Sequence, residues 1–568
     1  MEERTTLMSN KMISVVAIVG FSFLLVIWYL VGNSQTRKSE FEYGLEEHWD
    51  VYIDGAPRFK DCSIAEANFG TLDKGTVLDM YVELPEELDG GYSVDILVYL
   101  CSLEAYLDDE LIYSYGTDEV ARDVMVGSGH HFIQLPDKVA GKRLQFHMVM
   151  NEDNAFANIL TPKCAKTGSI RVAFARTQLI NTMIGMFLMV LGATLAVVAM
   201  IAVWFERVYT RLIYIGWFAF FMGAWTLLTN KSWQIFSNIT VSMTTLEYAT
   251  LFFAPVPFGL LMYDMRKHEQ SWRRTTIVSV LVFFICFASV TTLLHVTNIV
   301  RYPEVLVLFH VVIIVGIAIM VVAGYFAVQE KTESDRITVL SAMVMMFILI
   351  MDVVRFNLQK YWMPNNDLMM NSIIPLGTLV FVIMLLVSYL IYLYRMVLTK
   401  QEKESLTDLA YHDALTGLLN RTKYEEDLDE LENGDSDFAI ISMDVNGLKE
   451  VNDNLGHGQG DKLLTGFAEI LSNNFGDIGA CYRIGGDEYM VIVDAAHIGQ
   501  IHHALLNFTM DESDASQDLE YNIQASYGVA YRSETESGQA YKVYRLADQR
   551  MYEMKSEVKG KNYSFGKA

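Results

Sequence analysis

Eight long apolar segments constrain this chain more than any other feature of its sequence. The first, residues 12–31, has about the twenty-residue length that a helix needs to cross a bilayer. A cleaved signal peptide is the alternative, but the lack of a clear small-x-small cleavage site favours a retained anchor. Seven further segments and a hydrophobic content of 52% predict a multi-pass membrane protein. These segments lie near residues 178–204, 212–229, 244–264, 275–296, 304–328, 337–358 and 370–394.

Basic residues alternate between the connections of the seven later segments. The first, third and fifth connections are rich in Arg and Lys, whereas the second, fourth and sixth carry only Lys231, Arg301 and Lys360. Because basic loops stay in the cytoplasm, the odd connections are predicted inside and the region before the seven segments outside. The basic residues of the odd connections are Arg207, Arg211, Arg266, Lys267, Arg273, Arg274, Lys331 and Arg336.

Short alternating patterns fill residues 32–176 and predict strands. One alternating apolar set begins at Val94 and another at Leu144, and residues 106–113 indicate a hairpin with an acidic turn. We expect an antiparallel, jelly-roll-like β-sandwich. The region loosely resembles the sensor domains that precede seven-helix bacterial receptors, which implies an external ligand. A saccharide, a peptide and a partner protein all stay open as that ligand, and the flanking helices imply contact with membrane lipid.

The remaining part of the chain is polar. Residues 395–411 have helical spacing and are expected to continue the last membrane helix and to pair with a second copy. From residue 413 onward, predicted helices and strands alternate, which indicates an α/β domain. The net charge of −25 argues against a nucleic-acid-binding surface, which needs an excess of Lys and Arg.

A pair of glycines followed by two carboxylates is the first candidate site in this domain. Gly485 and Gly486 lie between two predicted strands, residues 480–484 and 489–493, and Asp487 and Glu488 follow them. Glycines permit positive φ and leave room where a ligand approaches the backbone. Adjacent carboxylates at a hairpin tip are candidate metal ligands.

A second strand, residues 438–445, ends in Asp444 within an apolar run. A buried carboxylate needs a partner, and Mg²⁺ shared with Asp487 is a natural one, with Mn²⁺ as an alternative. Residues 446–449 are expected to form a turn whose N–H groups and Lys449 face phosphates. Asn452 and Asp461 can together read the edge of guanine. Lys555 and Lys561 are candidates for further phosphate charge.

Three motifs in this region resemble the GGDEF family of diguanylate cyclases. They are residues 413–421 (DALTGLLNR), 443–461 (MDVNGLKEVNDNLGHGQGD) and 483–489 (RIGGDEY), in family order over about 160 residues. The resemblance implies a palm-like α/β fold and the condensation of two GTP molecules into cyclic di-GMP with release of two pyrophosphates. It also implies a homodimer, because each site holds one GTP.

Residue roles follow from the resemblance by position. Asp444, the carbonyl of Val445 and Asp487 would bind the metal, and Glu488 would assist metal binding or deprotonate the attacking hydroxyl. The remaining implied contacts are Asn452 and Asp461 to guanine, Lys449, Lys555 and possibly Lys561 to phosphates, and Gly485 and Gly486 as space for the nucleotide.

The chain departs from the family pattern at several positions. Tyr489 stands in place of the usual Phe, and Asn446 in place of a second Asp. The Arg-x-x-Asp feedback motif is replaced by residues 476–479 (GDIG), which predicts weak or absent product inhibition. The spacing from Lys555 to Lys561 is about two residues longer than usual, so either lysine, or Lys559 between them, is open as the phosphate contact.

The sequence thus predicts five parts and one principal function. The parts are residues 1–31, a cytoplasmic start and anchor or signal peptide; 32–176, an extracytoplasmic β-sandwich; 177–394, a seven-helix membrane region; 395–411, a signalling helix; and 412–568, a GGDEF domain. The predicted function is a signal-regulated diguanylate cyclase in a bacterial inner membrane. The alternative is a receptor with an inactive, GTP-binding GGDEF module.

Overall fold

The computed structural model describes residues 43–565 except for short gaps, and these form parts of two compact units, Met1–Tyr394 and Arg395–Ala568. The predicted anchor, residues 12–31, lies outside the described residues. The gaps are residues 65–66, 68–69, 89, 154, 157–160, 206–208, 238, 267–271, 329–332, 363–371, 518 and 536–538.

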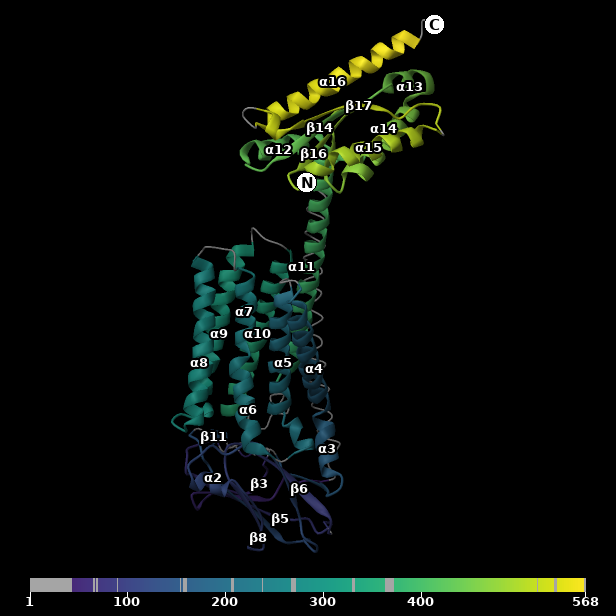
Figure 1. The fold of residues 1–568 in the computed structure, drawn as a ribbon. Coiled ribbons are helices and arrows are strands. Elements are labelled where there is room, and N and C mark those ends of the chain that lie inside the picture. The colour runs from purple at the N-terminus through teal and green to yellow at the C-terminus, as the bar shows by residue number, and fades with distance from the viewer. Residues whose placement is uncertain are drawn as a thin grey trace, which may run out of the picture. The chain divides into compact units, whose positions relative to one another are not determined.

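Two antiparallel sheets form the predicted β-sandwich at the start of the first unit (Figure 1). One sheet has the order β1-β12-β6-β9 and the other β3-β2-β5-β10-β7-β8. The first comprises β1 (Tyr43–Gly44), β12 (Lys163–Lys166), β6 (Tyr92–Val98) and β9 (Gly129–Gln134). The second comprises β3 (Ala56–Cys62), β2 (Trp49–Ile53), β5 (Val77–Glu83), β10 (Arg143–Val149), β7 (Leu103–Leu107) and β8 (Glu110–Tyr115). Smaller elements are β4 (Thr71–Leu72), β11 (Ala155–Phe156) and α2 (Thr117–Ala121).

The alternation read from the sequence describes β10 well and β6 only in part. Leu144, Phe146 and Met148 are buried between the sheets, as expected. In β6, Val94 and Ile96 enter the same core, but Asp95 on the opposite face is also buried. It is buried because that face is covered too, and the side chain of His130 bonds to it at 2.8 Å. The sheet is therefore packed on both sides at β6.

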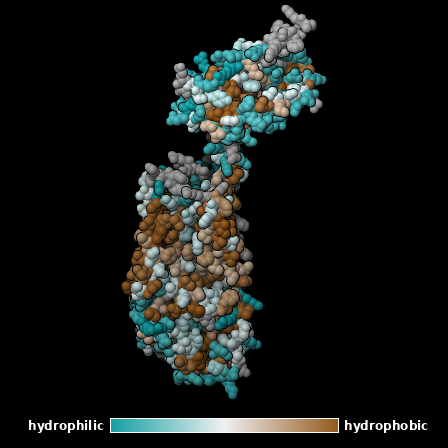
Figure 2. All heavy atoms as spheres, viewed as in Figure 1, coloured by the Kyte–Doolittle hydropathy of each residue, from teal (hydrophilic) through white to brown (hydrophobic). Residues whose placement is uncertain are grey.

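Within the described part of the chain, seven helices long and apolar enough to cross a membrane follow the sandwich, as predicted. Figure 2 shows hydrophobic residues over much of the visible face of these helices. The third span is divided into two helices at Pro255, because proline lacks the N–H that a continuous helix would need there. The helices are α3 (Ile170–Thr177), which precedes the spans, then α4 (Leu179–Ala202), α5 (Thr210–Thr229), α6 (Thr240–Phe253), α7 (Pro255–Asp264), α8 (Trp272–Val296), α9 (Tyr302–Val328), α10 (Glu333–Tyr361) and α11 (Ile374–Tyr411), with a 3₁₀ turn at Ser232–Ile235.

Polar contacts tie α11 to its neighbours in the bundle. Asp352 of α10 pairs with Arg355 at 2.9 Å and also accepts the N–H of Ile373 just before α11. Toward the other end, the hydroxyl of Ser388 bonds that of Thr338 at 2.7 Å. The guanidinium of Arg211 lies 4.0 Å from the ring centre of Tyr392. Arg211 also contacts carboxylates of α7 and α10.

The second unit is an α/β domain built on a five-stranded sheet of order β13-β15-β16-β14-β17. Two hydrophobic cores lie on its two faces, one beneath α14 and α15 and one beneath α12 and α16. Its strands are β13 (Leu419–Asn420), β14 (Phe438–Val445), β15 (Gly479–Arg483), β16 (Glu488–Asp494) and β17 (Ala525–Tyr531). Its helices are α12 (Arg421–Asn433), α13 (Leu448–Leu455), α14 (His457–Phe475), α15 (Ile501–Ser516) and α16 (Ala540–Phe565), with 3₁₀ turns at Ile498–Gln500 and Arg532–Glu534.

The helix α11 belongs to both units. It runs without a break over 38 residues, from the last membrane span through residues 395–411. At its end, the side chain of Asn420 donates to the carbonyl oxygen of Ala410 at 2.8 Å. The α/β domain therefore begins directly where the membrane helix ends.

Candidate active site

Asp444 lies at the buried end of the central strand β14. Alternate residues of this strand face opposite cores: Phe438 and Ile440 pack with α12 and α16, and Ala439 and Ile441 pack with α14 and α15. By the same alternation Asp444 faces α16, and it is only 6% exposed. A carboxylate buried this far needs a positive partner.

Lys555 of α16 is that partner. Its Nζ donates to Oδ1 of Asp444 at 2.5 Å, so an ammonium group occupies the position where the sequence placed a metal ion. The contact is possible because α16 packs directly on β17: a Cβ at Gly528 would lie 2.2 Å from the carbonyl oxygen of Ala547. Only glycine allows so close an approach of helix and strand.

The hairpin of β15 and β16 brings both predicted carboxylates beside Asp444. The strands were predicted within one residue at each end, and in the register of β14 and β16 Glu488 lies opposite Asp444. The N–H of Val445 donates to the carbonyl oxygen of Asp487 at 2.9 Å. Asp444, Val445, Asp487 and Glu488 are therefore neighbours at one edge of the sheet.

The two glycines of the turn lack a side chain where space is needed, but they do not adopt positive φ angles. Neither Gly485 nor Gly486 has a positive φ, so that part of the prediction was wrong. A Cβ at Gly486 would meet no atom within 4 Å, whereas one at Gly485 would lie 3.1 Å from Oε2 of Glu488. The turn is thus open on the side of Gly486, which fits the approach of a ligand to its backbone.

Residues predicted to bind guanine lie on two consecutive helices. Asn452 is in α13 and Asp461 in the first part of α14, and Gly460 lies between them in the fold as well as in the sequence. A Cβ at Gly460 would lie 2.0 Å from Oδ1 of Asn452, so the amide of Asn452 rests directly on this glycine. Asp461 is exposed and Asn452 half-buried.

The expected turn at residues 446–449 is present at residues 446–447, and helix α13 begins at Leu448. Gly447, with φ of 77°, is the N-cap of α13, and Lys449 is an exposed residue of its first turn. The helix forms because Leu448 and Val451 pack one face against the domain core. The N–H of Asn446 donates to the carbonyl oxygen of Gln524 at 2.8 Å. The first N–H groups of a helix have no partner within it, so a phosphate contact near Lys449 stays a prediction that rests on the start of α13.

Arg483 is a site residue that the sequence reasoning passed over. Its Nη1 donates to Oδ1 of Asp413 at 2.8 Å, and its Nη2 donates to the carbonyl oxygen of Gly486 at 2.8 Å. Burial alone would raise the pKa of Asp413, but the hydrogen bonds from Arg483 and Thr416 hold that pKa below its ordinary value. Arg483 therefore ties the glycine turn to the segment that follows α11. The feature of the sequence that could have indicated this role is the position of Arg483, three residues before Gly486.

Two departures from the family pattern are accommodated locally. The hydroxyl of Tyr489 donates to the carbonyl oxygen of Leu464 at 3.1 Å, and its ring packs 4.7 Å from that of Phe467. Asn446 accepts a hydrogen bond from Ser526 at 3.2 Å. Lys561 falls in α16, but its side chain lies outside the described residues.

The donor set at the sheet edge fits a magnesium ion that is completed by its substrate. Among the described residues, no three His, Cys, Asp or Glu side chains are grouped as a preformed cage. Mg²⁺ typically uses only one or two carboxylates and takes its other ligands from water and phosphates. The cation already on Asp444 shows that this carboxylate is placed to hold positive charge.

Comparison with known proteins identifies the domain that carries this site. Residues 410–561 match the family model described as "Diguanylate cyclase, GGDEF domain". The second unit contains a GGDEF domain. The match includes every candidate site residue described above.

Relatives share this domain rather than the whole chain. Diguanylate cyclase DgcS of Shewanella oneidensis is 30% identical over 166 residues, 28% of this chain and 54% of that protein. Diguanylate cyclase DgcN of Escherichia coli is 32% identical over 155 residues, 26% of this chain and 38% of that protein. A crystal structure of the coiled coil and GGDEF domain of DgcB from Caulobacter crescentus, in complex with c-di-GMP, covers 29% of this chain and 91% of that chain, with 22% identity and a TM-score of 0.27. The chain thus spans about half or less of the curated relatives named here.

Proposed function

We propose that this chain is a membrane-bound diguanylate cyclase whose activity is set by a ligand of the β-sandwich. The observation that carries the proposal is the meeting of Asp444, Val445, Asp487 and Glu488 at one sheet edge within a GGDEF domain. Each GTP would contribute its 3′-hydroxyl oxygen to the α-phosphorus of the other GTP. Two P–O bonds form, two pyrophosphates leave, and cyclic di-GMP results.

The carboxylates would hold Mg²⁺, or Mn²⁺, against the triphosphate. Asp444, the carbonyl of Val445 and Asp487 are the proposed ligands, and the metal would neutralise charge that develops on the phosphates. Lys555 must leave Asp444 when the divalent ion arrives, because both cations compete for one carboxylate. Its flexible stem allows the ammonium group to move to a phosphate instead. Glu488, opposite Asp444, is proposed to accept the proton of the attacking hydroxyl or to assist the metal.

The nucleotide would be selected on the side of α13 and α14. Asn452 and Asp461 offer an amide and a carboxylate, which match the acceptors and N–H donors of guanine. Adenine lacks the N1–H group from which Asp461 would accept a hydrogen bond. Lys449 and Lys561 are proposed as phosphate contacts together with Lys555, and Gly485 and Gly486 leave space beside the base and phosphates.

Catalysis would require two such domains facing each other. One GTP per domain leaves each active site incomplete, so we propose a homodimer. The helix α11 supports this proposal, because it leads directly from the last membrane span into the GGDEF domain. Pairing of residues 395–411 between two copies would allow the membrane region to control how the two active sites meet.

The basic residues give the orientation that we propose. The sandwich contacts the connections near Gln234 and Arg301, which carry few basic residues, whereas Arg211 lies with Tyr392 at the other end of the bundle. The positive-inside rule then places the sandwich outside and the GGDEF domain in the cytoplasm. We retain the five-part division at residues 31, 176, 394 and 411 as part of this proposal.

The decisive test is product formation by the full-length protein in nanodiscs supplied with GTP and Mg²⁺. We expect cyclic di-GMP, identified by mass spectrometry, from the wild type and from the control Asp477→Ala, an exposed aspartate in the same domain. Asp487→Ala should give none. GTP binding without product in the wild type would instead support the inactive receptor module.

A further inference from the structure

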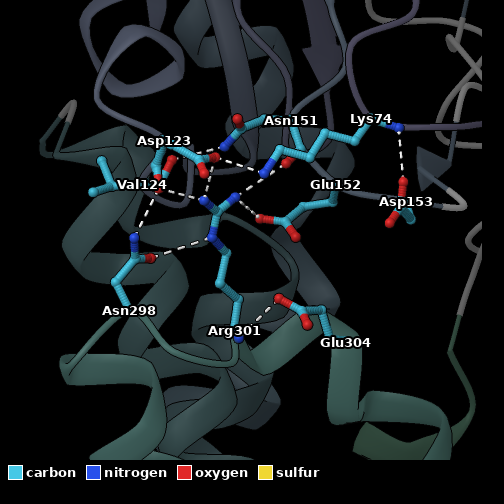
Figure 3. A network of polar contacts seen from close by, with 9 residues as sticks. All are labelled: Lys74, Asp123, Val124, Asn151, Glu152, Asp153, Asn298, Arg301 and Glu304. Carbon is cyan, nitrogen blue, oxygen red and sulfur yellow. Dashed lines mark hydrogen bonds and ion pairs between the residues drawn. The ribbon is translucent and has the colours of Figure 1, made fainter.

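One short stretch of the sandwich, Asp123–His130, contacts the membrane bundle near both of its ends, and we call it the docking segment. It follows α2 and leads into β9. Its first residue contacts the α8–α9 connection, and its last residues contact the α5–α6 connection. Figure 3 shows the first of these contacts, where Arg301 reaches from the bundle into a group of sandwich residues.

Arg301 uses all three of its side-chain nitrogens at this contact. Nη1 donates to the carbonyl oxygen of Asn151 at 3.1 Å and to Glu152 at 2.8 Å, and Nη2 donates to the carbonyl and the carboxylate of Asp123, the latter at 2.6 Å. Nε donates to the side chain of Asn298 at 3.2 Å. All five N–H donors of the guanidinium group, which is only 6% exposed, are therefore used, and they join the sandwich to the bundle.

Arg301 also lies directly before the membrane helix α9. Its backbone N–H donates to the carboxylate of Glu304 at 3.0 Å, the bond that closes the start of α9. The next residue, Tyr302, is fully buried and stacks on Tyr248 of α6 at 5.6 Å between ring centres. A displacement of Arg301 is therefore a displacement of the N-terminus of α9.

The other end of the docking segment is closely packed, and its hydrogen bonds to the bundle join uncharged groups. Gln234 bonds both main-chain groups of His130, each at 2.9 Å, and the N–H of Ser128 donates to Thr244 at 3.0 Å. A Cβ at Gly127 would lie 2.5 Å from the carbonyl carbon of Thr240. This end has no room for sliding, since backbone rests directly on backbone.

The two ends differ in how easily they open. The Arg301 end depends on charge. Its Asp123 partner is 64% exposed and is shared with Lys74, which bonds it at 2.6 Å, whereas its Glu152 partner is only 5% exposed. Exposed ion pairs exchange readily with water and salt, so the Asp123 pair opens more easily than the buried Glu152 pair. The hydrogen bonds of the Gln234 end to the bundle join uncharged groups and are backed by close backbone contact. The Arg301 end can therefore open stepwise from its exposed Asp123 pair, whereas the Gln234 end cannot slide without a backbone collision.

We propose that the docking segment is the contact by which the sandwich controls the bundle, with Arg301 as a releasable latch and the Gln234 end as the pivot. Opening of the latch frees the start of α9, and the change passes through the packed helices to α11. This inference goes beyond the proposed function, and it applies whether the GGDEF domain synthesises cyclic di-GMP or only binds GTP.

The test is hydrogen–deuterium exchange on the full-length protein in nanodiscs, without any added ligand. We compare the wild type with Arg301→Gln and with Arg122→Gln, a matched change at an exposed neighbouring arginine that contacts Glu119 and Asp118 within the sandwich. Because Arg301→Gln leaves the buried Glu152 unpaired, the double variant Arg301→Gln/Glu152→Gln removes both charges and guards against misfolding.

For both Arg301 variants we expect faster exchange at the latch and in the C-terminal part of α11. Residues 120–126 and 298–304 report the latch, residues 395–411 report transmission to α11, and residues 127–131 should stay as protected as in the wild type. Arg122→Gln should match the wild type throughout. Unchanged exchange at the latch, or loss of the latch with no change at 395–411, would overturn the proposal. Absence of cyclic di-GMP in the wild type would count against the proposed function alone.

Discussion

Lys555 and Asp444 lie 111 residues apart in the sequence and touch at 2.5 Å in the fold. The sequence assigned the first to phosphate and the second to a metal ion. Their contact means that, without nucleotide, the domain neutralises its buried carboxylate with its own ammonium group. A divalent ion that binds Asp444 as proposed would have to displace this ammonium group, so its affinity would depend on Lys555.

Lys555→Met should strengthen metal binding while it weakens catalysis. Without the ammonium group, Asp444 loses a competitor worth roughly 1–2 kcal/mol, so Mn²⁺ should bind about 5- to 30-fold more tightly when no nucleotide is present. GTP turnover should fall, because a phosphate contact is lost. Mn²⁺ titration by electron paramagnetic resonance measures the first effect, with Asp444→Asn as background. Lys542→Met, an exposed lysine of the same helix, should behave as the wild type, and an unchanged Mn²⁺ affinity in Lys555→Met would contradict the argument.

Gly460→Ala should impair GTP binding through Asn452. The added methyl group would occupy the place of the Asn452 amide, which lies 2.0 Å from that Cβ position. The loss of one hydrogen-bonding side chain should raise KM for GTP by roughly tenfold, about 1.4 kcal/mol. Gly458→Ala is the matched control on the same helix, because its Cβ would meet no atom within 4 Å. Equal KM values for the two variants would disprove the role given to Asn452.

Gly486→Ala separates folding from ligand binding. The ligand-free turn has open space at this position and an ordinary φ, so the variant should melt within about 2 °C of the wild type. Its GTP turnover should nevertheless drop by at least tenfold, if the nucleotide passes over this glycine. Circular dichroism and a product assay on the same sample give the two numbers. Full activity would show that the nucleotide does not approach Gly486.

Glu512 makes the GGDEF domain less stable as the pH rises. Burial raises the pKa of Glu512 to about 8, although the N–H of Ala525 donates to it at 2.8 Å. The folded domain then holds a proton that the unfolded chain releases near its ordinary pKa, so stability falls between about pH 5 and pH 8, by at most ~1.4 kcal/mol per unit. Glu512→Gln keeps the hydrogen bond and removes the titration. Its advantage in melting temperature should grow from pH 5 to pH 8, and a constant difference would refute the assignment.

Added cyclic di-GMP should not slow the wild-type enzyme through residues 476–479. The feedback motif of the family is missing there, and a Cβ at Gly479 would lie 2.5 Å from the carbonyl oxygen of Ile492, which leaves no room for an aspartate. Turnover measured with increasing product should remain flat until the product competes at the active site. Tight product binding coupled to inhibition would overturn this prediction.

The sequence predicted those features that depend on local pattern. The run ending at Asp444, the hairpin before Glu488 and the hydrophobic alternation around Phe146 each follow from strand periodicity and turn residues. The seven membrane spans were found for the same reason, since length and apolarity are local properties.

The features missed by the sequence reasoning depend on the tertiary structure. The sequence predicts a turn at residues 446–449, whereas only residues 446–447 form one and Lys449 lies in the first turn of α13, which packs on the domain core. The contact of Arg483 with Asp413 joins residues 70 positions apart, which no periodicity reports. The positive charge of Arg301 was counted for membrane orientation, whereas its partners Asp123 and Glu152 come from a separate domain. Burial of both faces of β6 likewise depends on what covers the sheet.

The close packing at Gly127 has a consequence for evolution and engineering. A sandwich that carried any residue other than glycine at this position would drive its side chain into the backbone of Thr240. We therefore expect the sandwich and the loops that it contacts to change together during divergence. A chimaeric protein should keep its join away from this contact, with residues 123–130, 230–244 and 298–304 transferred as one block.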